Sequence, residues 1–218
     1  MIKKSIEMAV GENKKQLLLL IVLIFILLTA FSGCVNIKYA YIPDSVITKG
    51  WHENVSLRNT GLHFLGLEKW GSSIYELKGK YPASLTVTTV KTLVLTDEEE
   101  LQKKTIETLE ETFKDSIQLN ASTKITGERT LLKQHKTMYI TYEGKDINKD
   151  LNIKLIGEIW NCGDSGTSII CIGIAYISNS ENTTIENTDN WQRIVMDPSG
   201  TIENFTGEEG LIYNVYCH

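Results

Sequence analysis

Apolar positions divide the chain into an N-terminal apolar run and a longer region of alternating patterns. Leu17 to Phe31 is fifteen residues long and has no charge, and lysines precede it. A basic segment followed by an apolar one is typical of a signal peptide or a membrane anchor. About 20 apolar residues span a bilayer, so a spanning helix would have to extend to Val35. The pattern therefore predicts an N-terminal signal or anchor helix in residues 1–33.

The remaining region has the periodicity of several strands and one long helix. Ser84 to Leu95 is rich in β-branched residues and predicts a hairpin with Ile74 to Leu77. A capping box at Thr96 to Glu99 begins a helix whose apolar positions recur at helical spacing as Leu101, Thr105, Leu109, Phe113 and Ile117. We expect further strands near residues 123–131, 136–142, 152–161 and 168–177, and a short helix at 189–197.

The apolar run from Ser168 to Ile177 is almost continuous, which is typical of a strand buried on both faces. We therefore expect an α+β fold, with an antiparallel sheet and helices on both of its faces. This element order, over roughly Ser73 to Gly200, resembles the α/β/α sandwich of the PsbP superfamily, named for an extrinsic subunit of photosystem II. The resemblance carries over no functional residues. It implies a non-enzymatic accessory or assembly factor on a membrane-bound complex.

The apolar run ends in Ala30-Phe31-Ser32-Gly33-Cys34, which resembles the lipobox of prokaryotic lipoproteins, with Phe31 where leucine is usual. Cys34 is therefore the expected site of lipid attachment. Cleavage before it would leave residues 34–218 as one domain, with its core at about 73–200. An uncleaved helix and simple secretion remain alternatives. The lysines before the run place the N-terminus in the cytoplasm and the domain on the extracytoplasmic face of the cell membrane.

Charge limits the class of partner. The chain has 22 basic and 27 acidic residues, of which residues 1–33 contain four lysines and two glutamates, so 18 against 25 remain and the net charge is −7. Affinity for nucleic acid comes largely from lysine and arginine on phosphates. We therefore expect no nucleic-acid partner. The expected partners are the membrane, through the N-terminal lipid or helix, and a protein that the sequence does not identify.

Three cysteines remain besides Cys34, and an exported location favours their oxidation. Cys162 and Cys171 flank a predicted hairpin turn, so we expect a disulfide between them. A bridge from Cys217 to either one, or three reduced thiols, is the alternative. A zinc site of these three with His218 lacks the close paired spacing of such sites, so no metal ligands are assigned.

Four Asn-x-Ser/Thr triplets in the exported region are possible glycosylation sites and would then lie at the surface. Their asparagines are Asn54, Asn120, Asn182 and Asn204.

Gly163-Asp164-Ser165-Gly166 is similar to the nucleophile motif of chymotrypsin-like serine proteases. That chemistry requires a histidine base oriented by a carboxylate. The motif's usual continuation and the family's histidine segment are missing here, and these residue types are those that tight turns select. His52, Glu53 and His63 match no metal-ligand spacing. The sequence therefore predicts no catalytic residue and no cofactor.

These observations favour a non-enzymatic, membrane-anchored surface lipoprotein that acts as a binding or accessory factor for a membrane-associated complex. The alternative is an extracytoplasmic hydrolase or a solute-binding lipoprotein. A deep cleft lined by convergent titratable side chains would favour the alternative.

Overall fold

The computed structural model describes residues 38–217, with the exception of 48–49, 64–67, 93–97, 114, 164–165, 178–184 and 204–208. The expected signal or anchor segment and Cys34 lie outside these residues, as does Thr96, the expected helix cap. The residues from 37 to 218 group into one compact unit. Among the described residues, no helix combines the length and apolar character needed to cross a membrane.

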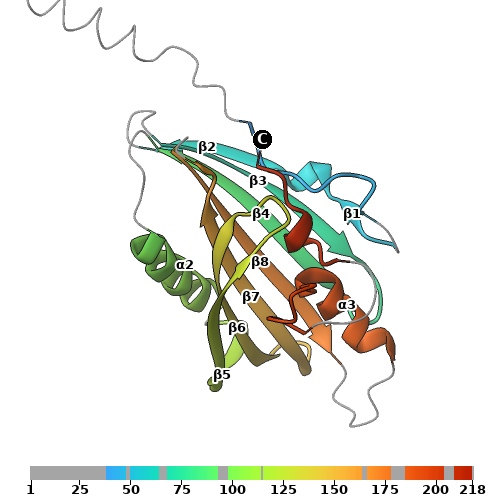
Figure 1. Ribbon diagram of the computed structural model, residues 1–218. Helices are drawn as coiled ribbons and strands as arrows, with labels where there is room; N and C mark the ends of the chain where they lie inside the picture. The colour runs from blue at the N-terminus through green and yellow to red at the C-terminus, as the bar shows by residue number, and fades with distance from the viewer. Residues whose placement is uncertain are drawn as a thin grey trace, which may run out of the picture. The chain divides into compact units, whose positions relative to one another are not determined.

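An eight-stranded antiparallel sheet forms the body of this unit (Figure 1). Its strands follow the order β1-β3-β4-β8-β7-β6-β5, and β2 also pairs with β3. Their bounds are β1 His52–Glu53, β2 Asn59–His63, β3 Glu68–Leu77, β4 Ala83–Thr92, β5 Ile117–Thr130, β6 Lys136–Asp146, β7 Leu151–Asn161 and β8 Thr167–Ile177. The predicted β3–β4 hairpin and the four later strands are therefore confirmed.

Two α-helices and two short 3-10 helices accompany the sheet. Their bounds are η1 Val55–Leu57, α2 Glu98–Phe113, α3 Ile185–Val195 and η4 Ile212–Asn214. The long helix expected after β4 is α2, and the short helix expected near the C-terminus is α3. Both predicted helices are confirmed, and their boundaries differ from the prediction by a few residues.

Successive residues of β7 point to opposite faces of the sheet. Ile156 belongs to the larger core, which contains Trp191 and Ile194 of α3 and the C-terminal segment. Leu155 belongs to the smaller core, which contains Leu109 of α2. The α3 face is therefore the better covered of the two. On the α2 face, residues of β3 and β4 remain half-buried.

The expected α+β sandwich is wrong, because one antiparallel sheet dominates the described chain: its eight strands have only two α-helices beside them, one against each face, so neither face has a full helical layer. The apolar run of β8 misled the prediction. Ile170, Ile172 and Ile174 on the α2 face are only half-buried, whereas Ile169 and Cys171 on the other face are fully buried. A β-branched residue suits a half-open pleated surface, so an apolar run does not require a complete helical layer.

Candidate functional site

A cluster of buried charged side chains lies on the α3 face, over the three strands β7, β6 and β5 at one side of the sheet. Arg129 of β5 is paired with Thr137 of β6, and Tyr139 of β6 is paired with Glu158 of β7. Side chains at paired positions share a face of the sheet. The register therefore brings the guanidinium of Arg129, the hydroxyl of Thr137 and the carboxylate of Glu158 together.

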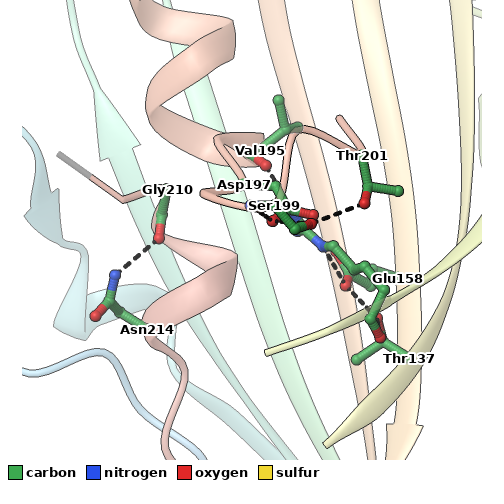
Figure 2. A network of polar contacts seen from close by, with 9 residues as sticks. Thr137, Glu158, Val195, Asp197, Ser199, Thr201, Gly210 and Asn214 are labelled. Atoms are coloured by element: carbon green, nitrogen blue, oxygen red, sulfur yellow. Dashed lines mark hydrogen bonds and ion pairs between the residues drawn. The ribbon is translucent and has the colours of Figure 1, made fainter. Parts of the chain in front are cut away.

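Arg129 and Glu158 form a two-pronged ion pair, and Figure 2 shows Glu158 beside Thr137 in this cluster. The Arg129 Nε donates to Glu158 Oε1 over 2.8 Å, and its terminal nitrogen Nη2 donates to Oε2 over 2.5 Å. The Thr137 hydroxyl donates to Glu158 Oε1 over 2.6 Å. Paired N–H donors that match both carboxylate oxygens make this the stronger class of ion pair.

The segment that follows α3 completes the cluster. Arg129 Nη1 donates to the carbonyl of Val195, at the end of α3, over 2.6 Å, and it lies 3.9 Å from Asp197 Oδ2. The other oxygen of Asp197 accepts hydrogen bonds from the amide and the hydroxyl of Ser199, at 2.8 and 2.7 Å. Asp197 thus fixes the turn after α3 and contributes a second negative charge beside the guanidinium (Figure 2).

These charges act on one another through a medium of low polarity. Burial by itself would lower the pKa of Arg129, but the charge of Glu158, its hydrogen bonds and the charge of Asp197 outweigh burial and raise that pKa. Cys171 faces Glu158 across the β7–β8 pair. Burial, reinforced by the charge of Glu158, raises the pKa of the Cys171 thiol well above its usual value. This cysteine is therefore a neutral core residue.

The contacts of this cluster indicate a structural role. The side chains of Arg129, Glu158 and Asp197 are all fully buried, with an exposed fraction of 0%. A catalytic acid or base must come within hydrogen-bond reach of its substrate, and a fully buried side chain does not reach a substrate in solution. The cluster joins β5, β6 and β7 to the end of α3, and thereby fixes the wall of a groove that lies beside it.

That groove has a volume of about 390 Å³ and lies on the α3 face between β5, β6 and β7 and the segment from α3 to residue 203. Tyr139 and Thr141 belong to its sheet side, Trp191 and Ile202 to its other wall, and Ile125 to its rim. Pockets of roughly 300–1,000 Å³ accept small ligands or a few side chains of a partner. Ile125 is 60% exposed, so the rim of the groove is apolar at this position.

The charged side chains of the groove already form ion pairs with one another. Lys154 Nζ lies 2.6 Å from Glu203 Oε1 and 3.9 Å from Glu143 Oε1. The same ammonium group lies 5.7 Å from the centre of the Trp191 ring, where the attraction of a cation to an aromatic face applies. The arrangement suits recognition of a partner with both polar and apolar groups.

Strand β5 is the outer strand beside this groove. It pairs with β6 alone among the described strands, and most of its side chains outside the two ends are exposed or half-buried. Its register with β6 shifts between Asn120 and Ile125, where four residues oppose one. A bulge of this kind bends an edge strand and is common next to binding sites. The open edge and the groove therefore form one continuous surface.

The expected disulfide is wrong. Cys162 is bonded to Cys217, with their Cα atoms 6.4 Å apart, and Cys171 is a buried free thiol. The β7–β8 register explains the difference, because it pairs Cys171 with Glu158 and leaves Cys162 beyond the last paired residues. Cys162 is therefore free to bond a segment that is 55 residues away in the sequence.

Two of the possible glycosylation sites are described, and their surroundings differ. The Asn54 side chain donates its amide N–H to Glu76 Oε1 over 2.9 Å, so the nitrogen that a glycan would modify is already engaged. Asn120 is exposed on the edge strand, and its oxygen accepts hydrogen bonds from the amide and the hydroxyl of Ser122. Asn182 and Asn204 lie outside the described residues.

The protease-like motif occupies the turn between β7 and β8. The Cys162 amide donates to the Thr167 carbonyl over 2.8 Å, and Gly163 and Gly166 adopt positive φ angles of 60° and 67° that favour glycine. Asp164 and Ser165 lie outside the described residues.

Among the described side chains, His52 and Glu53 do not belong to a group of three possible metal ligands, and the side chain of His63 lies outside this description. Glu53 is engaged by Arg58 at 2.6 Å, whereas His52 lies 3.4 Å from Glu76. Within the described part of the chain, His135, Cys162 and Cys217 are the one group of three or more possible metal ligands whose ligand atoms lie close together.

Sequence reasoning missed the Arg129–Glu158 pair and the groove. Glu158 sits in the apolar stretch from Leu155 to Trp160 of β7, where a buried charge requires a partner. The sequence therefore indicates that Glu158 needs a partner, but only the order of the strands shows that the partner is Arg129. No protein-family model matches this chain, and no curated protein or solved structure is similar enough to match it.

Proposed function

We propose that this protein is a non-enzymatic, membrane-anchored lipoprotein on the extracytoplasmic face, and that it binds a protein partner in a membrane-associated complex. The N-terminal apolar run and Cys34 supply the anchor, and the groove beside β5 supplies the binding surface. The observation that carries the proposal is the contrast between two sites. The cluster of Arg129, Glu158 and Asp197 is fully buried, whereas the open groove has ion-paired side chains and an apolar rim.

The occupant we propose is an extended segment of the partner protein. An extended chain can add a strand to an open sheet edge through main-chain hydrogen bonds, while neighbouring pockets select alternate side chains. The outer edge of β5 and the groove offer these two features side by side. Ile125 and Trp191 favour an apolar side chain in the segment, and the carboxylates of Glu143 and Glu203 favour a basic one beside it.

Site-specific photocrosslinking in intact cells tests this proposal. A photoreactive amino acid at Ile125 should form adducts with one membrane-associated protein, identified by mass spectrometry. The matched control is the same amino acid at Ile147, which is 59% exposed in the β6–β7 turn, against 60% for Ile125. Adducts that depend on position 125 support the proposal. Equal labelling from both positions, or no protein adduct from Ile125, contradicts it, and a small-molecule adduct at Ile125 alone would indicate a solute-binding lipoprotein instead.

A further inference from the structure

Three segments that are distant in the sequence meet at one end of the sheet and place a histidine beside the disulfide. The ring nitrogen Nε2 of His135 lies 3.4 Å from Cys217 Sγ. The possible ligand atoms of His135, Cys162 and Cys217 all lie within 4.8 Å of one another. Cys162 and Cys217 are buried, and His135 is half-buried. We propose that these three residues form a binding site for a zinc-class divalent cation when the disulfide is reduced, and this inference does not depend on the proposed function.

The distances fit the coordination chemistry. Zinc binds cysteine sulfur at about 2.3 Å and histidine nitrogen at about 2.0–2.1 Å in tetrahedral geometry, which places the two ligand atoms roughly 3.5 Å apart. The observed separation between His135 and Cys217 is close to that value. Two thiolates would need to be roughly 3.8 Å apart by the same geometry, so rotation of the two cysteine side chains suffices once the sulfur–sulfur bond is broken.

The backbone of each segment is fixed by contacts other than the disulfide. His135 lies in the β5–β6 turn, where the Leu131 amide donates to its carbonyl over 2.9 Å. Cys217 follows Tyr216, whose amide and carbonyl are both hydrogen-bonded to Tyr41 at 2.9 Å. Figure 1 shows this C-terminal segment beside the first described residues. We therefore expect the ligand positions to persist after reduction.

The third ligand and the histidine ring are also held in place. The amide of Cys162 donates to Thr167 across the β7–β8 turn, so this cysteine is fixed at the end of the hairpin. The ring of His135 stacks on that of Trp160, with the planes 27° apart and the centres separated by 6.5 Å. The stacked ring directs Nε2 towards the two sulfur atoms.

The redox and proton balance is simple. A dithiol reductant transfers two electrons and two protons to the Cys162–Cys217 bond and becomes a disulfide itself. The cation then replaces the two thiol protons, and neutral His135 donates a lone pair. Two thiolates cancel the charge of a divalent cation, so the complex can occupy this buried place without a net charge. The fourth coordination position is left for solvent, as is usual when the protein supplies three ligands.

Cobalt titration of the full-length protein in detergent tests the site. All samples contain Cys34→Ser, which removes an unrelated thiol. After reduction and removal of the reductant, the protein should bind one Co²⁺ per chain with a thiolate-to-cobalt absorption band, and Zn²⁺ should abolish the band by displacement. The oxidised protein should show neither. Cys217→Ser should abolish the band, and His135→Ala should weaken affinity by about tenfold or more, since even outer-shell substitutions cost that much.

Two matched controls and a folding measurement make the result decisive. His52→Ala removes an exposed histidine in β1, and Cys171→Ala removes the buried free thiol, so both should leave cobalt affinity unchanged. Near-ultraviolet circular dichroism should show that the reduced protein keeps its tertiary structure. The proposal is overturned if the reduced fold collapses, if the band is absent, or if Cys217→Ser binds cobalt as well as its parent does.

Discussion

At the scale of residues, the dominant feature is the sealed ion pair between Arg129 and Glu158. Removing one charge of a buried pair leaves the other poorly compensated and costs about 3–5 kcal/mol of the free energy of unfolding. We therefore expect Glu158→Gln to destabilise the protein by about that amount, measured by urea denaturation. The matched control is Glu53→Gln, which removes an exposed pair with Arg58 and should cost less than about 1 kcal/mol. Equal losses in the two variants would contradict the assigned role.

Asp146 gives the protein a specific acid sensitivity. Burial by itself would raise its pKa, but hydrogen bonds from Tyr176 and from the amides of Lys149 and Asn148 outweigh burial and lower that pKa. A carboxyl whose pKa is lower in the folded state stabilises the fold above its unfolded pKa, and this contribution disappears as the pH falls through the folded value.

We therefore expect Asp146→Asn to be less stable than the parent near neutral pH, with a difference that shrinks below about pH 4. Urea denaturation at a series of pH values measures it. A difference that stays constant through the acid range would show that the hydrogen-bonded turn, and not the charge of Asp146, is what matters.

At the scale of elements, the Cys162–Cys217 bond joins the end of β7 to the C-terminal segment. It closes a loop of 55 residues, and removal of such a bond costs about 2–4 kcal/mol. We expect Cys217→Ser to lower the thermal midpoint by roughly 2–4 °C per kcal/mol lost. Cys171→Ala is the control and should retain the bond. Peptide mapping without reduction should join the Cys162 and Cys217 peptides, and a peptide that joins Cys162 to Cys171 would refute the observed pairing.

Helix α2 lies close to the sheet because Gly157 of β7 has no side chain. A Cβ atom at this position would lie 2.6 Å from Leu109 Cδ1, which is too close for an undisturbed packing. We expect Gly157→Ala to cost about 1–3 kcal/mol by displacing the helix, as overpacking does. Faster hydrogen exchange in residues 98–113 than in α3 would locate the effect. Uniform acceleration in both helices would indicate general destabilisation instead.

At the scale of the whole molecule, the mode of attachment decides where the groove can act. If Cys34 carries lipid, mass spectrometry of the N-terminal peptide should find a modified Cys34 as the first residue of the mature protein. Cys34→Ala should then leave the apolar run uncleaved without changing the side of the membrane on which the domain lies. An unmodified Cys34 thiol within a longer N-terminal peptide would establish a single-pass anchor in place of a lipoprotein.

The sequence by itself determined the local elements. The β-branched run of Ser84 to Leu95 and the helical spacing from Leu101 to Phe113 depend on neighbours within a few residues, so β4 and α2 were predictable. The strands from β5 to β8 were predictable for the same reason. The candidate anchor is also a local property of the sequence, because it rests on one apolar run and the cysteine that follows it.

Only the tertiary structure decided which distant residues meet. The antiparallel register brings Arg129 to Glu158 and separates Cys162 from Cys171, and the return of the C-terminal segment to Tyr41 brings Cys217 to Cys162 and His135. Strand order also determined how far the two helices cover the sheet, and so the fold class. These outcomes depend on long-range pairing, in which a shift of one residue moves every side chain to the other face.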